Sequence, residues 1–216
     1  MNTIHVVRSK NRRTVGIQIM SDMSITIKVP ERFPDSKINK LLEDHKDWIQ
    51  QKQNTMKMRT ADKAPDEYLY LGKKYQLATR HNQKSLIELE DKFYFALPNS
   101  KNVKTYLESW YKQQANKIIG ERVKHYALIA GLTYKSVAIT SAETRWGSCS
   151  SQKTLNFNWR LVMAPLAVID YVVTHELAHL TELNHSIDFW ETVRKMYPLY
   201  RQYRTWLRRY GDMLRI

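Results

Sequence analysis

The sequence lacks the features that mark secreted and membrane-spanning proteins. Its 216 residues contain a single cysteine, Cys149, so no disulfide can form within the chain. No segment approaches the roughly 18 consecutive apolar residues that a membrane-spanning helix needs. The first residues, MNTIHVVRSKNRRTV, lack the continuous apolar run of a secretory signal. From these absences we expect a cytoplasmic protein that does not associate with a membrane.

Acidic residues are also scarce relative to basic ones. There are 21 aspartates and glutamates against 35 lysines and arginines, which gives a formal net charge of +14. A field of this sign attracts polyanions and acidic protein surfaces, although it says nothing about fold. The alternative is a merely basic surface with no such partner. Otherwise the composition is ordinary, with 43% hydrophobic and 26% charged residues, and it predicts a packed globular protein.

Residues 1–98 are predicted to form a mainly β part. Apolar and polar residues alternate with period two in 14–20 and in 23–29, which is typical of half-buried strands. Ser21 and Asp22 can make the turn between these two strands. Further strands are predicted at 68–77, as a hairpin around Gly72, and at 86–89 and 93–97.

One helix interrupts this β part. The apolar residues between Asp35 and Ile49 recur at helical spacing. His45 lies on the apolar stripe and is predicted to be a packed core residue, not a ligand. The polar, basic segment 54–65 is a candidate linker.

Residues 99–216 are predicted to form a helical domain that includes a small sheet. A long helical pattern over 103–128 is followed by Gly131, a residue favoured just past helix ends. Two strand-like runs come next, at 136–140 and 154–159. Together with the β part, this pattern predicts an α+β fold. Three later helices are predicted to begin near Pro165, Ser186 and Pro198.

The stretch from His175 to His179 carries the strongest chemical signal, because it matches the pattern His-Glu-x-x-His. Residues four apart lie on one face of a helix, so both histidines can bind the same zinc ion. Glu176 is rotated by about 100° from His175, which keeps it out of the ligand set yet close to it. A carboxylate there can take a proton from water and later pass it to a leaving amine.

His185, ten residues after His175, is the candidate third ligand. Three protein nitrogens would leave the fourth position of a tetrahedral zinc ion free, as catalytic zinc sites require. Glu182 is the main rival, since a carboxylate also serves zinc in sites with two histidines.

Several short segments surround these residues: 145–149 (RWGSC), 155–161 (LNFNWRL), 164–165 (AP), 171–179 (YVVTHELAH), 184–186 (NHS) and 189–190 (FW). Together they resemble the YgjP-like metallopeptidases, which are related to the SprT-like proteases. The resemblance is densest from Arg145 to Trp190 and extends more weakly to the N-terminal strands and to 70–72 (YLG). It implies a zincin-type catalytic domain with His175, His179 and His185 as ligands and Glu176 as base. It also implies an intracellular protein whose natural substrate is poorly defined.

Metzincins share the spacing of ten residues between the first and third histidines. However, Glu182 occupies the position of their glycine, and no Met-turn follows the histidines. Met196 and Met213 are predicted to be core or surface residues. The sequence therefore argues against membership of the metzincins.

A peptidase also needs a donor for the oxyanion that develops on the scissile carbonyl. Arg145, Ser148 and Tyr171 are the candidates for this role or for substrate contact. By analogy with other zincins, the run 154–159 is expected to be the strand edge that receives the substrate. We predict that at least two of the three aromatic residues Trp146, Phe157 and Trp159 pack in the core.

Three hypotheses apply to Cys149. A buried, small hydrophobic residue is the favoured one. The alternatives are a fourth zinc ligand, which would close the site, and a nucleophile paired with His175. The nucleophile hypothesis leaves Glu176 and His179 without a purpose.

The C-terminal segment combines basic and aromatic residues. Arg201, Arg204 and Arg208 share one helical face and alternate with tyrosines and a tryptophan. Such a pattern can bind phosphates and stack on bases, so these arginines are candidate nucleic-acid contacts. The alternative is that the aromatic rings pack onto the domain and the arginines are solvated.

The sequence thus predicts a zinc-dependent metallopeptidase with one Zn²⁺ per chain, acting on a protein or peptide. One alternative is a basic protein that binds nucleic acid and uses its metal structurally. Another is a metal-dependent hydrolase of a non-peptide amide. Other divalent metals can also occupy such a ligand set.

Overall fold

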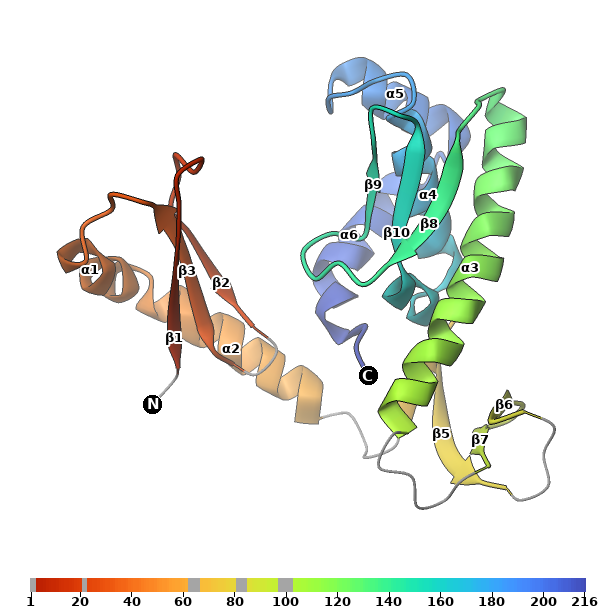
Figure 1. Ribbon diagram of the computed structural model, residues 1–216, viewed down its shortest axis with the longest axis horizontal. Coiled ribbons are helices and arrows are strands. Elements are labelled where there is room, and N and C mark those ends of the chain that lie inside the picture. Colours follow the sequence, from red (N-terminus) through yellow and green to blue (C-terminus); the bar gives the residue numbers. More distant parts are fainter. Residues whose placement is uncertain (1–2, 21–22, 62–66, 81–84, 97–102) are drawn as a thin grey trace. The chain divides into compact units, whose positions relative to one another are not determined.

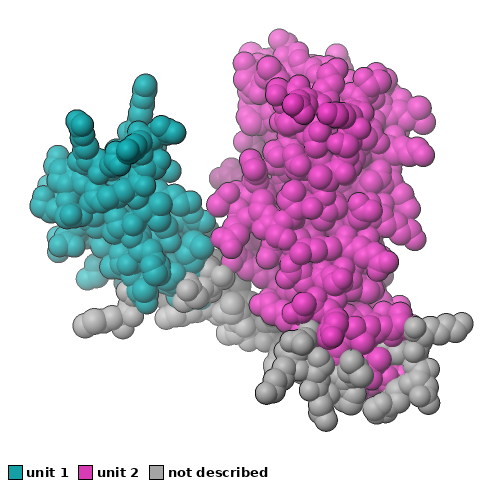
Figure 2. Space-filling view, in the orientation of Figure 1, with its two compact units in different colours: residues 1–64 teal, residues 65–216 magenta. Residues whose placement is uncertain are grey.

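We describe a computed structural model of the chain over residues 3–20, 23–61, 67–80, 85–96 and 103–216. The chain forms two compact units, Met1–Ala64 and Pro65–Ile216, which Figure 2 colours separately. Helices and mixed sheets occur together, which confirms the predicted α+β class. Within the described ranges, no helix has the length and apolar character needed to cross a membrane.

The contacts divide the chain at 64/65, whereas the sequence suggested a domain boundary at 98/99. The strands after residue 65 share a core with the long helix that follows them, and this places them in the second unit. Contacts in a folded chain do not test which segment folds alone, so the boundary at 98/99 stays a prediction.

The first unit is a small sheet with two helices (Figure 1). Strands β1 (Ile4–Ser9), β2 (Gly16–Ile19) and β3 (Ile25–Pro30) are ordered β1–β3–β2. β2 pairs antiparallel with β3, whereas β1 pairs parallel with it. Alternate residues of β3 point into the core because successive side chains of a strand face opposite sides. The buried core residues are Ile25, Ile27, Val29, Ile38 and Ile49.

The helical part of this unit differs from the prediction. There are two helices, α1 (Ser36–Asp44) and α2 (Lys46–Ala61), in place of one. His45 separates them and is exposed, so its prediction as a core residue was wrong. Its ring Nδ1 donates to the Leu41 carbonyl at 2.9 Å. The linker prediction was wrong for 54–61, which belong to α2; its remainder, like the predicted Ser21-Asp22 turn, lies outside the described residues.

The second unit contains two separate sheets. The first has the order β4–β5–β7–β6, from strands Glu67–Tyr70, Lys73–Thr79, Phe93–Phe95 and Ile87–Leu89. The second has the order β8–β10–β9, from strands Ser136–Thr140, Thr154–Asn158 and Gly147–Cys149. β9 was not predicted, since three residues are too few to show a period.

Four helices complete this unit: α3 (Val103–Ala130), α4 (Leu166–Ala178), α5 (Ile187–Met196) and α6 (Tyr200–Tyr210). α3 runs along most of the unit in Figure 1 and is followed by Gly131, whose φ is +63°. α4 is central, because it packs against α3, α5, α6 and β9. The helix predicted to carry the histidines is therefore held from several sides.

Two contacts fix the position of α4. At its start, the turn between β4 and β5 docks on the chain ahead of the helix, where Leu71 and Gly72 donate backbone N–H groups to the carbonyls of Val162 and Met163 at 2.8 and 3.1 Å. Further along, Arg122 of α3 forms a two-point ion pair with the buried Asp170, with nitrogen–oxygen distances of 2.6 and 3.0 Å. Both contacts lie away from the histidines.

Candidate metal centre

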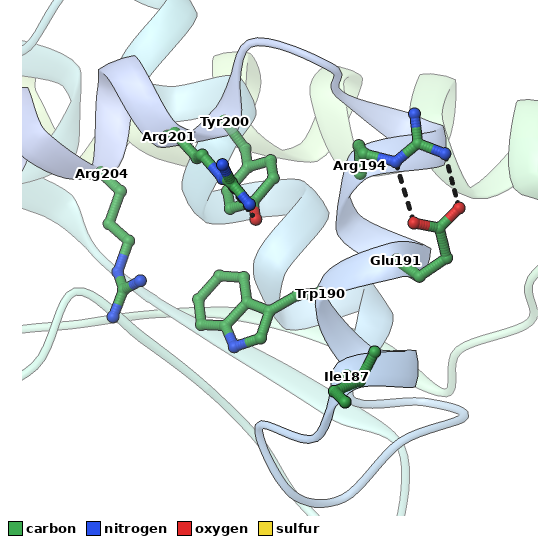
Figure 3. A pocket seen from close by; sticks show the side chains of 7 residues that line it. All are labelled: Ile187, Trp190, Glu191, Arg194, Tyr200, Arg201 and Arg204. Atoms are coloured by element: carbon green, nitrogen blue, oxygen red, sulfur yellow. Dashed lines mark hydrogen bonds and ion pairs between the residues drawn. The ribbon is translucent and has the colours of Figure 1, made fainter.

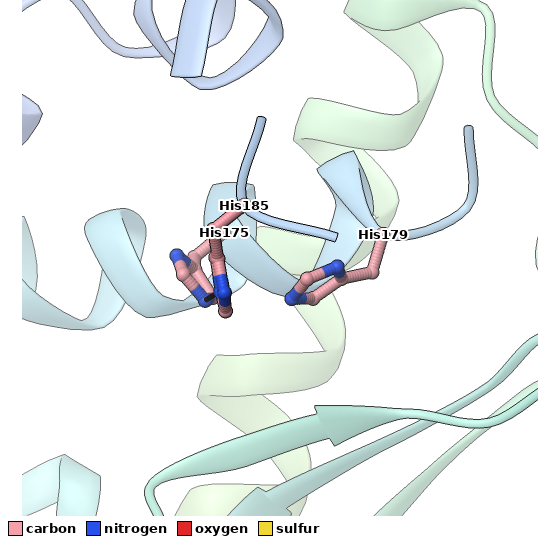
Figure 4. Close-up of side chains that lie close together, drawn as sticks. All are labelled: His175, His179 and His185. Atoms are coloured by element: carbon pink, nitrogen blue, oxygen red, sulfur yellow. Dashed lines mark hydrogen bonds between the residues drawn. The ribbon is translucent and has the colours of Figure 1, made fainter. Parts of the chain in front are cut away.

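Helix α4 and the chain reversal after it bring three histidines together (Figure 4). His175 lies in the last turn of α4, and His179 is the residue that caps its C-terminus. The chain then turns back and delivers His185 just ahead of α5. One ring nitrogen from each histidine lies within 4.8 Å of the others, as expected for residues that share one metal ion.

The nitrogen spacing suits a tetrahedral ion. Nε2 of His175 and Nε2 of His185 lie 3.1 Å apart. Two ligands held at about 2.1 Å from a tetrahedral zinc ion would be roughly 3.4 Å apart. The described residues offer no hydrogen-bond partner to the buried Nδ1 of His175, so its tautomer is set by whatever Nε2 binds.

Glu182 contributes to the centre through its backbone, not its side chain. Its carbonyl oxygen accepts a hydrogen bond from Nδ1 of His179 at 2.9 Å. A carbonyl can only accept, so Nδ1 carries the proton and the lone pair of Nε2 is free to bind a metal. Within the described residues, the metal-ligating group contains the three histidines and not the Glu182 carboxylate, which argues against Glu182 as a ligand.

Aromatic rings of α5 support all three imidazoles. Phe189, which is fully buried, lies with its ring centroid 4.9, 4.5 and 4.7 Å from those of His175, His179 and His185. Trp190 stacks on His185 at 5.7 Å. Burial in these surroundings lowers the pKa of His175 to about 3, with the neighbouring His179 adding to the effect. His175 is therefore neutral near pH 7, the form that binds metals.

Glu176 follows His175 in α4 and is 5% exposed. Burial raises its pKa to about 8, and the charge of Arg145 opposes that shift in part. A cation bound by the adjacent histidines would lower this pKa again. A carboxylate that titrates near neutrality can both accept and return a proton, which is what a general base needs.

The position of Glu176 depends on Gly147 in β9. A Cβ atom at residue 147 would lie 2.5 Å from Oε1 of Glu176 and 2.6 Å from its Cγ. Such contacts are too short for any side chain, so only glycine leaves room for the carboxylate. Sequence reasoning missed this residue, although it lies within the segment 145–149 that carries the family resemblance.

The strand edge beside α4 is β9, and not the run 154–159. All of that run except Trp159 forms β10, which lies between β8 and β9, so its prediction as an edge was wrong. β9 pairs antiparallel with β10 and packs against α4. Its other side has no strand neighbour within the described part of the chain.

The three candidate oxyanion or substrate contacts lie in different surroundings. Tyr171 is 7% exposed, its ring centroid is 5.9 Å from that of His175, and burial raises its pKa to about 12. The Ser148 hydroxyl accepts a hydrogen bond from the Asn156 amide at 3.3 Å. Arg145 is exposed. Their roles stay predictions.

The aromatic residues near the strand edge pack largely as expected. Phe157 and Trp159 are fully buried in the core of the second unit. Trp146 is half-buried at the margin of that core. Core packing is therefore confirmed for two of the three.

Cys149 lies in β9, outside the group of metal-ligating atoms found among the described residues. Its thiol donates to the Ser150 carbonyl at 3.6 Å. Burial raises the pKa of the thiol, with a further contribution from Glu176, and this disfavours the thiolate that a ligand or nucleophile requires. The structure therefore favours the hypothesis that Cys149 is a small packed residue.

The C-terminal arginines are exposed on α6. Arg204 lies over the Trp190 ring at 4.5 Å, and Arg201 lies beside Tyr200. These two line a pocket, whereas Arg208 does not. Nucleic-acid contact through the three arginines stays a prediction.

Comparison with known protein families gives a match that spans nearly all of the chain. A family model described as "YgjP-like, metallopeptidase domain" matches residues 13–210, a range that includes the three histidines and Glu176. The curated proteins contain no significant match. Among solved structures, the chain is similar to the metallopeptidase zymogen of Pyrococcus abyssi abylysin, at 22% identity and a TM-score of 0.39, over 41% of this chain and 90% of that one.

Proposed function

Because the chain belongs to the YgjP-like metallopeptidase family, we propose that it hydrolyses peptide bonds with one zinc ion held by His175, His179 and His185. In this proposal Glu176 is the general base. The observation that carries it is the convergence of three imidazoles, with one ring nitrogen of each within 4.8 Å of the others, next in sequence to one buried carboxylate. His185 is exposed, so the centre opens to solvent on the side from which a substrate would enter.

The chain's own residues prepare the centre in three ways. The Glu182 carbonyl holds the tautomer of His179, and Phe189 packs against all three rings and limits their movement. Glu176 takes a proton from the attacking water on its carboxylate and passes it to the leaving amine. When bound, the zinc ion would supply Lewis acidity, which polarises the scissile carbonyl and makes water more acidic.

The free edge of β9 is the proposed place for the substrate backbone. An extended peptide can pair with an exposed strand edge through main-chain hydrogen bonds. β9 packs against α4 and contains Gly147, which touches Glu176, so a peptide paired there would lie close to the base. Arg145, Ser148 and Tyr171 remain the proposed donors to the oxyanion or contacts to the substrate.

A structural metal would need a fourth protein ligand, because closed zinc sites have four. The described residues offer three at this position. This favours an open, catalytic centre over a binding protein that uses its metal only for stability.

Glu176→Gln tests the proposal directly. We expect one zinc ion per chain to be retained and peptide hydrolysis to fall by about 1,000-fold, the scale of a lost general base. Metal analysis and cleavage of a peptide library, followed by mass spectrometry, measure the two quantities. His185→Ala is the matched control, since it should lose zinc as well as activity. Full activity in Glu176→Gln, or full zinc occupancy in His185→Ala, would contradict the assigned roles.

A further inference from the structure

A pocket of about 510 Å³ is lined by side chains of α5 and α6 (Figure 3). It lies between α5 and α6 and shares Trp190 with the metal centre, since this ring is 5.7 Å from the rings of both His175 and His185. A ligand in the pocket would therefore be next to a substrate bound at the histidines. The lining residues are Ile187, Trp190, Glu191, Arg194, Tyr200, Arg201 and Arg204.

Positive charge in this pocket is only partly neutralised. Glu191 makes a two-point ion pair with Arg194, at nitrogen–oxygen distances of 2.9 and 2.6 Å. Arg201 and Arg204 have no carboxylate partner within the described residues. Arg201 donates its Nε–H to the Tyr200 hydroxyl at 3.2 Å, and Arg204 lies over Trp190. Two guanidinium groups thus retain donors for an incoming anion.

Two aromatic side chains of the pocket, Trp190 and Tyr200, hold these arginines in place. Trp190 and Tyr200 stack with their ring centroids 5.4 Å apart and their planes 16° apart. A guanidinium held against such rings loses less conformational freedom when it binds, and its planar fork matches a carboxylate. The rings also offer an apolar surface to the stem of an acidic side chain.

Arg204 lies close to the metal centre. Its guanidinium carbon is 4.5 Å from the centroid of the Trp190 ring, and that ring is 5.7 Å from the rings of both His175 and His185. An anion bound by Arg204 would therefore be close to the substrate's scissile bond and not at a remote surface.

Resting on the proposed peptidase function, we propose that this pocket selects substrates by binding a carboxylate close to the scissile bond through Arg201 and Arg204. The carboxylate can come from an aspartate or glutamate side chain or from the free C-terminus of a peptide. A compact pocket with two available arginines matches one such group. Nucleic acid would instead require a row of phosphate contacts, and Arg208 lies outside the pocket.

Binding to the zinc-loaded, full-length Glu176→Gln variant tests this proposal, with fluorescence anisotropy as the readout. Three labelled peptides differ at one group: an internal glutamate with an amidated C-terminus, glutamine at that position with an amidated C-terminus, and glutamine with a free C-terminus. We expect one carboxylate peptide to bind about 10-fold more tightly than the neutral peptide, the scale of one charge-assisted hydrogen-bond pair. Which of the two binds tightly identifies the source of the carboxylate.

Two variants, made in the Glu176→Gln background, locate the effect. Arg204→Ala should remove the preference, so that acidic and neutral peptides bind equally. Arg201→Ala should also weaken it, and it provides a second variant if loss of Arg204 disturbs the histidines. Arg209→Ala removes the same charge from the same helix outside the pocket and should keep the preference.

Three results would overturn the proposal. The first is equal binding of all three peptides. The second is an equal loss of preference in Arg209→Ala and Arg204→Ala, which would indicate general attraction to a basic surface. The third is that Arg204→Ala weakens binding of a single-stranded oligonucleotide but not of the acidic peptide.

Peptide hydrolysis by the unmodified enzyme is measured in parallel. Selective binding of a carboxylate peptide without any hydrolysis would contradict the proposed function and leave the pocket assignment intact. Hydrolysis without any acidic preference would contradict the pocket assignment alone.

Discussion

The two halves of helix α4 differ in what surrounds their side chains. From Leu166 to Thr174 the helix is mostly buried, and the polar side chain of Asp170 is neutralised by Arg122 from α3. From His175 onward, side chains that could serve catalysis predominate, and their neighbours come from β9, α5 and the Glu182 carbonyl. The first half anchors the helix, whereas the second half depends on three other segments for its geometry. Mutations in the two surroundings should therefore affect stability and activity separately.

The largest effect on stability is expected from Arg122→Ala, which removes the ion pair that anchors the first half of α4. It leaves Asp170 buried without its partner and should lower the free energy of unfolding by about 3 kcal/mol. Urea denaturation followed by circular dichroism measures the loss, while zinc content per folded molecule should not change. Lys112→Ala, which removes an exposed ion pair on the same helix, should cost no more than about 0.5 kcal/mol. Equal losses in the two variants would remove the distinction between the halves.

Gly147→Ala should affect activity through the second half of α4, which contains Glu176, and leave the anchoring first half unchanged. The added methyl group would collide with Oε1 and Cγ of Glu176, so the carboxylate must move. Moving the carboxylate out of its position is expected to lower kcat about 100-fold while zinc binding persists. Gly120→Ala is the matched control, because its methyl group would meet nothing within 4 Å. If Gly147→Ala retained full activity, the base would not need its observed position.

Gly72→Ala should lower the free energy of unfolding by about 2 kcal/mol, less than Arg122→Ala, because it combines backbone strain with a steric collision at the start of α4. Gly72 has a φ of +80°, and a Cβ atom there would lie 2.8 Å from Cγ of Pro165 at the start of α4. Gly131→Ala isolates the strain, since Gly131 has a φ of +63° and open space around it. Thermal denaturation of both variants should show the larger loss for Gly72→Ala. Identical losses would mean that contact with Pro165 is unimportant.

The part of the fold that the sequence predicted well is the part with a regular hydrophobic period. The predicted strands at 136–140 and 154–159 and the long helix from Val103 follow such periods. The structure confirms them except at Trp159, which lies beyond the end of β10. β1 is exposed along its whole length, so it has no buried face to produce a pattern. At His45 the apolar stripe of the sequence continues, but the helix is interrupted because the residue has a non-helical backbone conformation, with φ −112° and ψ 11°. The period alone could not show that break.

The candidate site divides in the same way. The arrangement of His175, Glu176 and His179 follows from helix geometry, because the residues are adjacent in sequence. The contact of Gly147 with Glu176 joins segments 29 residues apart and depends on strand order, which no local pattern reports. Likewise, the spacing of the arginines in α6 suggested a nucleic-acid face, whereas their contacts with Trp190 and Tyr200 place two of them in a pocket.

The smallest effect is expected from Ser186→Ala, at the junction between the third histidine and its aromatic support. The Ser186 hydroxyl caps α5 by accepting a hydrogen bond from the Phe189 N–H at 3.2 Å. Its loss should lower the free energy of unfolding by about 1 kcal/mol. Because α5 carries Phe189 and Trp190 against the imidazoles, zinc affinity should fall by about 10-fold, the lower range for groups that support a metal ligand. Competition with a chelator measures that affinity, and Ser186→Asp, which keeps a capping oxygen, should restore it. If the alanine variant bound zinc as tightly as the unmodified protein, His185 would be positioned without help from α5.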